Sequence, residues 1–478
     1  MTVTINNPIV YGLVPNHYVG IDNSGAAAGR INALPQTLLV IGTRNPSSLE
    51  RLASSSPKIA TLRSDIVATD AEIKVANEEK KSAKEAYELA SVAFEALADA
   101  VPADERAIAE QDVVEAKKLL DEVVKNLDRL VDKKVSQNKD LSYLLEETKF
   151  QDSTVTTGQI SEVVSEDKAI ELYGRDSQLH KMFKKIFKAN PGASAYGTSF
   201  LTEPTNSEMV ELIANLPEMQ YTQVVFPFNA QNILSTLNGE MKERWKADRA
   251  IDGQIFCAFQ KSNTSHEQMF SAFDTEHITV MVTEGESEPA EWAASLAGVN
   301  SRYATEPSRP YQTLELPGIK GPAKTYDQSV RNNYLNKGIS TFKMDSESVR
   351  IERLVTTYKT RNGAPDISYR DLNWKQTVSY LRYDLRQAFF LNFPRHMLAP
   401  DGVVAAGPVL TPTKARAFIV SRFRMWQRMN LVVDPGEMFS KTVQAEIDIR
   451  EGTRLLIVLF PQLMNQYRQT HAEIRFLI

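Results

Sequence analysis

Few residues in this 478-residue sequence have the types and spacing that enzyme chemistry requires. His266-Glu267 lacks the second histidine of a zinc-binding HExxH helix, and the six histidines show no metal-ligand spacing. The single cysteine, Cys257, lies in the apolar segment QIFCAF, so we expect a small core residue rather than a nucleophile. GxGxxG, GxxxxGK[ST] and GxSxG are also absent from the sequence. The sequence therefore predicts no catalytic, cofactor or metal site, and one cysteine excludes a disulfide framework.

Three arginines lie close together in the segment SRFRMWQRMN, namely Arg422, Arg424 and Arg428. Contact with nucleic acid is one interpretation of such a cluster. The formal net charge is −5, however, and the sequence has no wider basic surface. We therefore favour arginines that flank a buried helix face or meet an acidic protein partner. No membrane span is expected either, because the strongest apolar run, LLIVLF at 455–460, has only the length of a strand.

Short apolar segments alternate with amphipathic segments of ten or more residues between 160 and 305. This alternation predicts βαβ units, and hence a parallel sheet covered on both faces. The segment TLLVIG at 37–42 predicts a further buried strand. Within 160–305 we expect strands at 221–228, 254–259 and 277–283, and helices around 230–248, 265–273 and 289–303.

Residues 64–150 differ sharply from this pattern. They contain 21 acidic and 13 basic residues, a net charge of −8, and no glycine occurs between Gly42 and Gly158. Apolar residues recur every three or four positions in two registers on either side of Pro102, which predicts an antiparallel helical hairpin with a coiled-coil seam. The first helix would have about 36 residues and a length of about 54 Å. We favour a plain projecting hairpin with solvated faces over a dedicated partner-binding arm.

The C-terminal part predicts an α+β domain with helices over 371–391 and 411–429 and a β-hairpin that turns at Glu451-Gly452. The chain then ends in HAEIRFLI, an apolar segment that either forms an interior strand of its own domain or completes a neighbour's sheet. The first residues are also strand-like and have few neighbours in sequence to pair with. Terminal strands of this kind link identical subunits into rings or helices. This favours a polymer, with an α/β enzyme that has an unrecognised site as the alternative.

Several ordered segments resemble contractile phage tail sheath proteins of the Mu-like type. They are VPNHYVGIDNSGAAAG with LPQTLLVIGTR, EDKAIELYGRDSQLHKMFKKIFKANP, RPYQTLELPGI, and GISTFKMDSESVRIERLVTTYKT. The resemblance covers most of 8–50 and 160–478, and the helical hairpin is not part of it. Taken with the residue patterns above, it predicts an α/β and α+β multidomain fold in which the coiled-coil hairpin is an insertion in a surface loop. The predicted parts are an N-terminal arm (1–20), an α/β sheath body (21–51 and 153–345), the inserted hairpin (52–152), a C-terminal α+β domain (346–469) and a C-terminal arm (470–478).

The resemblance also implies a function. Sheath subunits polymerise as hexameric rings in a helical tube around an inner tail tube, and the tube contracts to drive that inner tube through the cell envelope. The implied partners are further copies of the chain, the inner tail tube protein, and baseplate and tail terminator proteins, with no cofactor, nucleic acid or membrane insertion. The implied location is the virion tail, after assembly in the bacterial host cytoplasm. A related contractile injection or secretion system is the alternative, but those sheaths commonly split into two chains, whereas this chain is continuous.

Residue by residue, the resemblance places the contacts between subunits in the two arms and one strand. The acceptor strand would include Leu455, Ile457 and Leu459, and charged side chains of the C-terminal domain would contact the inner tube. The arm residues that it points to are Val3, Ile5, Ile9, Val10 and Tyr11 at the N-terminus and Ile474, Phe476 and Ile478 at the C-terminus.

Overall fold

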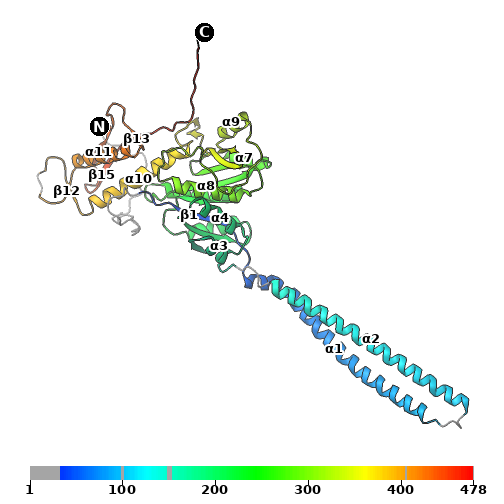
Figure 1. The fold of residues 1–478 in the computed structure, drawn as a ribbon. Coiled ribbons are helices and arrows are strands. Elements are labelled where there is room, and N and C mark those ends of the chain that lie inside the picture. Colours follow the sequence, from blue (N-terminus) through cyan, green and yellow to red (C-terminus); the bar gives the residue numbers. More distant parts are fainter. Residues whose placement is uncertain (1–32, 98–101, 148–152, 404–405, 477–478) are drawn as a thin grey trace. The chain divides into compact units, whose positions relative to one another are not determined.

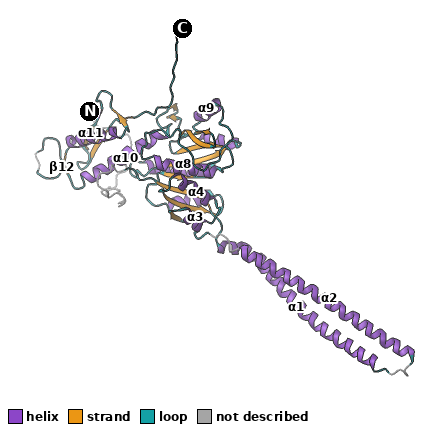
Figure 2. Cartoon of the chain, viewed as in Figure 1, coloured by secondary structure: helices purple, strands orange, loops and turns teal. Residues whose placement is uncertain are grey.

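A computed structural model describes residues 33–97, 102–147, 153–403 and 406–476 of the chain. The chain divides into two compact units, which are drawn in Figures 1 and 2. The larger unit comprises residues 1–45 and 154–478, and the hairpin unit comprises residues 46–153. The hairpin unit is thus close to the predicted insertion at 52–152 but starts earlier.

A six-stranded sheet in the order β2-β3-β1-β4-β5-β6 forms the centre of the larger unit. All neighbours pair in parallel except β2, which pairs antiparallel with β3 at one edge. The predicted mixed α/β class with a parallel sheet is therefore confirmed. The strands are β1 (Thr37–Thr43), β2 (Ile160–Val163), β3 (Ser194–Phe200), β4 (Gln223–Val225), β5 (Gln254–Gln260) and β6 (Ile278–Thr283).

Helices α4 and α8 pack against each other on one face of this sheet, where α8 contacts β1, β4, β5 and β6. Trp292 on α8 and Phe256 and Phe259 on β5 are fully buried in what we call the sheet core. The helices that connect the strands are α3 (Glu166–Tyr173), α4 (Gln178–Ala189), α5 (Asn206–Ala214), α6 (Gln231–Trp245), α7 (Thr264–Ala272) and α8 (Pro289–Tyr303).

Strand β3 is a central strand that the sequence analysis did not predict. Its sequence, SAYGTSF, consists largely of small and polar residues and carries a glycine at its centre. Gly197 is required there, because a Cβ atom would collide with the Tyr173 hydroxyl and the Phe183 ring. These two rings stack at a centroid distance of 5.9 Å over the strand. The rings of Tyr173 and Phe183 thus cover this strand, whose own sequence lacks the apolar side chains by which a buried strand is usually predicted.

The predicted domain boundary between residues 345 and 346 falls inside a β-hairpin. Strands β7 (Thr341–Asp345) and β8 (Ser348–Arg353) pair antiparallel. Phe342 from β7 and Ile351 from β8 are both buried in the sheet core. The core continues to Leu354 and Leu372, after helix α9 (Gln328–Asn336) and the hairpin. Two residues between the strands cannot separate domains when both strands pack into the same core.

A second apolar cluster, the C-terminal core, forms between helices α10 (Leu372–Asn392) and α11 (Pro412–Arg428). Trp426 is fully buried there, and the rings of Phe423 and Phe439 stack at 3.7 Å. Leu34, which precedes β1, also belongs to this core. The remaining elements are β9 (Thr360–Arg361), β10 (Ala364–Pro365), β11 (Met397–Leu398), β12 (Val409–Leu410), β13 (Val432–Val433), α12 (Phe439–Thr442), β14 (Gln444–Ile447), β15 (Leu455–Val458) and β16 (Gln462–Leu463).

The hairpin unit consists of two long helices, α1 (Ser48–Glu95) and α2 (Ala103–Glu147), which run side by side (Figure 1). Ion pairs between Lys134 and Asp70 and between Lys133 and Glu72 show that the helices are antiparallel. Its apolar cluster is small and contains Ala76, Leu127 and Leu130.

Helix α1 has 48 residues and is thus longer than predicted. It begins early because Ser47 and Glu50 form a reciprocal capping box, with Ser47 N donating to Glu50 Oε2 at 2.7 Å. It also continues through Pro57, a residue type that usually ends or kinks a helix. Among the helices within the described ranges, none combines the length and apolar composition of a membrane span.

Candidate assembly surfaces

The C-terminal segment after β16 contains no helix or strand between residues 464 and 476 (Figure 2). Ile474 is 90% exposed and Phe476 is 78% exposed, whereas Ile478 lies outside the described residues. The alternative in which this segment forms an interior strand of its own domain is therefore wrong for residues 470–476. Two large apolar side chains instead face solvent in a single copy of the chain.

The first residues of this segment, 464–468, which we call its root, are attached to the rest of the larger unit by a few polar contacts. Met464 N donates to the Leu431 carbonyl at 3.0 Å, next to the pairing of β13 with β16. Gln312 Nε2 then donates to the Tyr467 carbonyl at 3.2 Å. Arg468 forms an ion pair with Asp371 at 2.9 Å, the last ion pair or hydrogen bond between this segment and the rest of the described residues.

The predicted N-terminal contact residues Val3, Ile5, Ile9, Val10 and Tyr11 lie outside the described residues. Just after that region, Leu34 is buried in the C-terminal core and Thr37 begins β1. The short segment before β1 therefore links the C-terminal core to the central sheet.

Strands β14 and β15 form the hairpin that the sequence predicted, with Gln444 opposite Val458 and Ile447 opposite Leu455. The predicted acceptor residues Leu455 and Ile457 lie in β15, and Leu459 follows it. Ile457 and Leu459 pack against the C-terminal core. Within the described ranges β15 pairs only with β14, so its second edge offers unpaired backbone groups. Such an edge is a template for a strand from another chain.

An open groove of about 490 Å³ lies beside β14, on the side of the N-terminal end of α11. Arg416 Nη1 on α11 reaches the Ala445 carbonyl in β14 at 3.3 Å. Asp401, Glu446 and Asp448 also line this groove. Near it, Ile449 is 94% exposed, at the turn between β14 and β15. The β14–β15 hairpin thus combines an open strand edge, a polar groove and an exposed apolar side chain.

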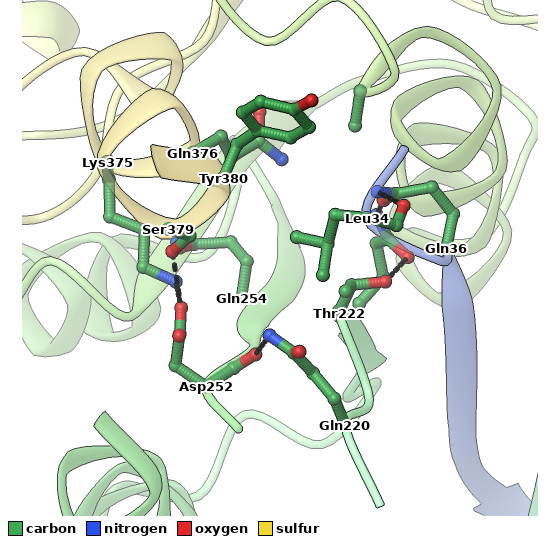
Figure 3. Close-up of a pocket in the computed structure, with 12 residues that line it drawn as sticks. Leu34, Gln36, Gln220, Thr222, Asp252, Gln254, Lys375, Gln376, Ser379 and Tyr380 are labelled. Atoms are coloured by element: carbon green, nitrogen blue, oxygen red, sulfur yellow. Dashed lines mark hydrogen bonds and ion pairs between the residues drawn. The ribbon is translucent and has the colours of Figure 1, made fainter. Parts of the chain in front are cut away.

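A buried polar cluster, which we call the polar joint, connects α10 to the loop before β5 (Figure 3). Asp252 accepts hydrogen bonds from Lys375 Nζ at 3.0 Å and Ser379 Oγ at 2.6 Å, and it pairs with Arg382. The side chains of Asp252 and Lys375 are only 3% and 2% exposed. A cavity of about 20 Å³ beside them has room for about one water molecule.

The charges in the polar joint are stabilised by each other. Burial alone raises the pKa of Asp252, but Lys375 and Arg382 outweigh burial and hold that pKa well below its usual range. Burial lowers the pKa of Lys375, and Asp252 opposes this shift. The polar joint therefore holds α10 against the loop before β5 through charge pairing. The sheet core and the C-terminal core are separate apolar clusters.

The three arginines of the cluster on α11 have different environments. Arg422 pairs with the buried Asp384, whose carboxylate also accepts a hydrogen bond from Trp426 Nε1 at 2.7 Å. The prediction that these arginines flank a buried face is confirmed for Arg422, while Arg424 and Arg428 are exposed.

Cys257 is fully buried in β5 as predicted, and burial raises the pKa of its thiol. Among the described residues, no group of three or more His, Cys, Asp or Glu side chains could hold a metal ion.

Comparison with known proteins identifies part of the larger unit. Residues 202–357 match the family model described as the phage tail sheath protein central domain. This part of the chain, about a third of its length, is therefore similar to a sheath central domain. This match includes β4 to β8 and hence both strands of the β7–β8 hairpin.

Sheath proteins are also found among relatives of the chain. It is 29% identical over 296 residues to the Mu-like prophage FluMu tail sheath protein of Haemophilus influenzae, a match that spans 60% of each chain. These matches confirm the predicted resemblance to tail sheath proteins of the Mu-like type. The match leaves about two fifths of that relative's length uncovered.

Two solved structures are similar to the chain at low sequence identity. The sheath tail protein of Desulfitobacterium hafniense is 11% identical with a TM-score of 0.41, over 57% of this chain and 64% of that one. The sheath tail protein of Listeria innocua is 9% identical with a TM-score of 0.46, over 65% of this chain and 93% of that one.

Proposed function

We propose that this protein is the structural subunit of a contractile phage tail sheath. Its copies polymerise as hexameric rings in a helical tube around an inner tail tube, and contraction of the sheath drives the inner tube through the cell envelope. The observation that carries this proposal is the exposure of Ile474 and Phe476 in the C-terminal arm of a single copy. The match of residues 202–357 to the sheath central domain supports it. Exposed apolar residues at a chain end favour pairing with another subunit.

The proposed receptor for this arm is the β14–β15 hairpin of a neighbouring copy. The second edge of β15 offers backbone donors and acceptors along Leu455 to Val458. Alternate arm residues Ile474, Phe476 and Ile478 would point to one face of the extended sheet, because strand side chains alternate. In this proposal each copy donates its arm to the next copy, so the contact is heterologous and forms rings or helices instead of closed dimers.

Contraction in this proposal is a change between two packings of the same subunits. Its free energy is the difference between these packings, summed over many copies. The arms keep neighbouring copies connected while the larger units move past one another. The polar joint supports movement of each larger unit as one body, since α10 is held to the sheet by buried charge pairs.

The proposed partners are further copies of the chain, the inner tail tube protein, and baseplate and tail terminator proteins. The proposed location is the virion tail, with assembly in the host cytoplasm. We also propose that the inserted hairpin forms a coiled coil that is dispensable for tube formation. Its place outside the matched residues 202–357 and its separate compact unit support this proposal.

Electron microscopy of the purified full-length protein tests the proposal. We expect tubes from the full chain, and their loss in the double variant Ile474→Asp/Phe476→Asp, because two charges oppose burial in a neighbour's sheet. The matched control is Val92→Asp, which places a charge at a 63% exposed apolar position on α1 and should leave the tubes unchanged. Tubes of normal yield from the double variant would contradict arm exchange.

A further inference from the structure

Asp371 is an unusual carboxylate because arginines surround it. It is the residue before α10, where an aspartate side chain ordinarily caps the helix, yet its carboxylate accepts no hydrogen bond from the first turn. Arg353 instead binds it through two hydrogen bonds, from Nε at 2.9 Å and from Nη2 at 2.8 Å. Arg468 adds an ion pair at 2.9 Å, and the Asp371 side chain is only 2% exposed.

The ion pair of Arg468 marks a sharp change along the C-terminal segment. Before it, the chain is attached at Met464 and Tyr467, and the Arg468 side chain is itself only 18% exposed. After it, Gln469 to Phe476 are exposed, and the ion pair of Arg475 is made within the segment, to Glu473. Since Arg353 holds Asp371 from a second side, the carboxylate is a fixed point for Arg468.

We propose that Arg468 is a positioning residue that fixes the root of the C-terminal arm on the larger unit through Asp371. The free arm then begins at Gln469, and its ten residues up to Ile478 reach about 33–36 Å from this root. The functional part of this inference, control of the arm that a neighbour receives, rests on the proposed function.

Loss of the ion pair should lengthen the free arm. Without the ion pair, single neutral hydrogen bonds still hold the segment, from Gln312 Nε2 to the Tyr467 carbonyl and from Gln466 Nε2 to the Ser308 carbonyl. The next hydrogen bond between two backbone groups is that of Met464 to Leu431, so Arg468→Ala frees at most the four residues 465–468. An arm of at most fourteen residues in place of ten lowers the effective concentration of its tip at the neighbour by up to roughly twofold. The arm would also no longer leave the larger unit in one fixed direction, which lowers this effective concentration further.

A fluorescent label on an engineered cysteine tests the root directly, below the concentration at which the protein assembles. Cys257 is fully buried, so Gln469→Cys and His471→Cys can each be labelled selectively in the full chain. We expect higher anisotropy at 469 than at 471, and Arg468→Ala should abolish this difference while Arg468→Lys partly retains it. The matched control Arg475→Ala removes an exposed arginine of the same arm and should preserve the difference. An unchanged difference in Arg468→Ala would overturn the proposal.

The critical concentration for tube formation, measured by sedimentation, tests the functional part. Arg468→Ala should raise it by up to roughly twofold, and Arg475→Ala should raise it less. A critical concentration that stays the same in Arg468→Ala, despite a mobile label, would show that the root does not control arm exchange. Absence of tubes from the unmodified chain would contradict the proposed function, whereas the anisotropy measurement would still decide whether Arg468 holds the root.

Discussion

The two compact units of this chain are stabilised in different ways. The larger unit buries large side chains such as Trp292, Phe256 and Trp426 completely, and it also buries charges such as Asp252. In the described part of the hairpin unit, the apolar cluster contains only Ala76, Leu127 and Leu130, and the ion pairs remain in contact with water. The first unit therefore depends on tertiary packing, whereas the second depends on two long helices and a narrow seam.

An ion pair should consequently contribute different amounts to the free energy of unfolding in the two units. The side chains of Asp252 and Lys375 are at most 3% exposed, whereas those of Lys134 and Asp70 are 38% and 47% exposed. Removal of one partner from a buried pair leaves an uncompensated charge in a low dielectric. Water solvates the remaining partner of an exposed pair at little cost.

The largest expected effect is that of Asp252→Ala. This variant leaves Lys375 buried without its carboxylate partner, so the free energy of unfolding of the larger unit should fall by about 3–5 kcal/mol. Urea unfolding followed by tryptophan fluorescence measures this change. The matched control Asp70→Ala breaks an exposed pair of the hairpin unit and should cost less than about 1 kcal/mol, measured by circular dichroism. An equal loss of unfolding free energy in the two variants would contradict the prediction that buried ion pairs matter more than exposed ones.

A smaller effect, confined to the other unit, is expected for Leu127→Ala. Truncation of this buried side chain should lower the stability of the hairpin unit by about 2–3 kcal/mol. All four tryptophans lie in the larger unit, so their fluorescence reports on that unit alone, while circular dichroism at 222 nm also reports on α1 and α2. We expect the helical signal to be lost at lower urea concentration with an unchanged tryptophan transition. A parallel shift of both signals would mean that the two units unfold together.

The smallest expected effect concerns pH and also separates the units, because the hairpin unit contains no histidine. Burial, aided by the nearby charge of Lys375, lowers the pKa of His277 from 6.5 to about 3. The unfolded chain therefore binds a proton near pH 6.5 that the folded chain refuses until about pH 3, so stability falls as the pH decreases through this window.

Replacement of His277 by phenylalanine removes this titration. The unfolding free energy of the larger unit in His277→Phe should therefore decline less between pH 7 and pH 5 than that of the unmodified protein, by about 1–2 kcal/mol. Tryptophan fluorescence in urea at both pH values measures the difference. Equal declines in the two proteins would show that His277 does not titrate on unfolding.

Local patterns in the sequence predicted much of the fold. The helices at 289–303 and 371–391 and the strand at 254–259 agree with α8, α10 and β5 to within a residue or two. The turn at Glu451-Gly452 located the β14–β15 hairpin correctly. In each case the periodicity of apolar residues or the chemistry of a turn depends only on neighbours along the chain.

The features that were missed depend on residues far apart in sequence. Strand β3 is recognisable only once the rings of Tyr173 and Phe183 approach Gly197. Similarly, no local pattern indicates that Asp371 turns away from its own helix to meet Arg353 and Arg468. Such signals exist only after the chain has folded.

The sequence by itself determined most of the strands and helices, and that the segment inserted between β1 and β2 is helical. Only the tertiary structure decided that the β7–β8 hairpin belongs to the sheet core, that buried charges join α10 to the sheet, and where the C-terminal arm becomes free. The physical reason is that secondary structure follows from the repeat of side chains along one segment. Domain boundaries and arm roots instead follow from contacts between segments that lie a hundred or more residues apart.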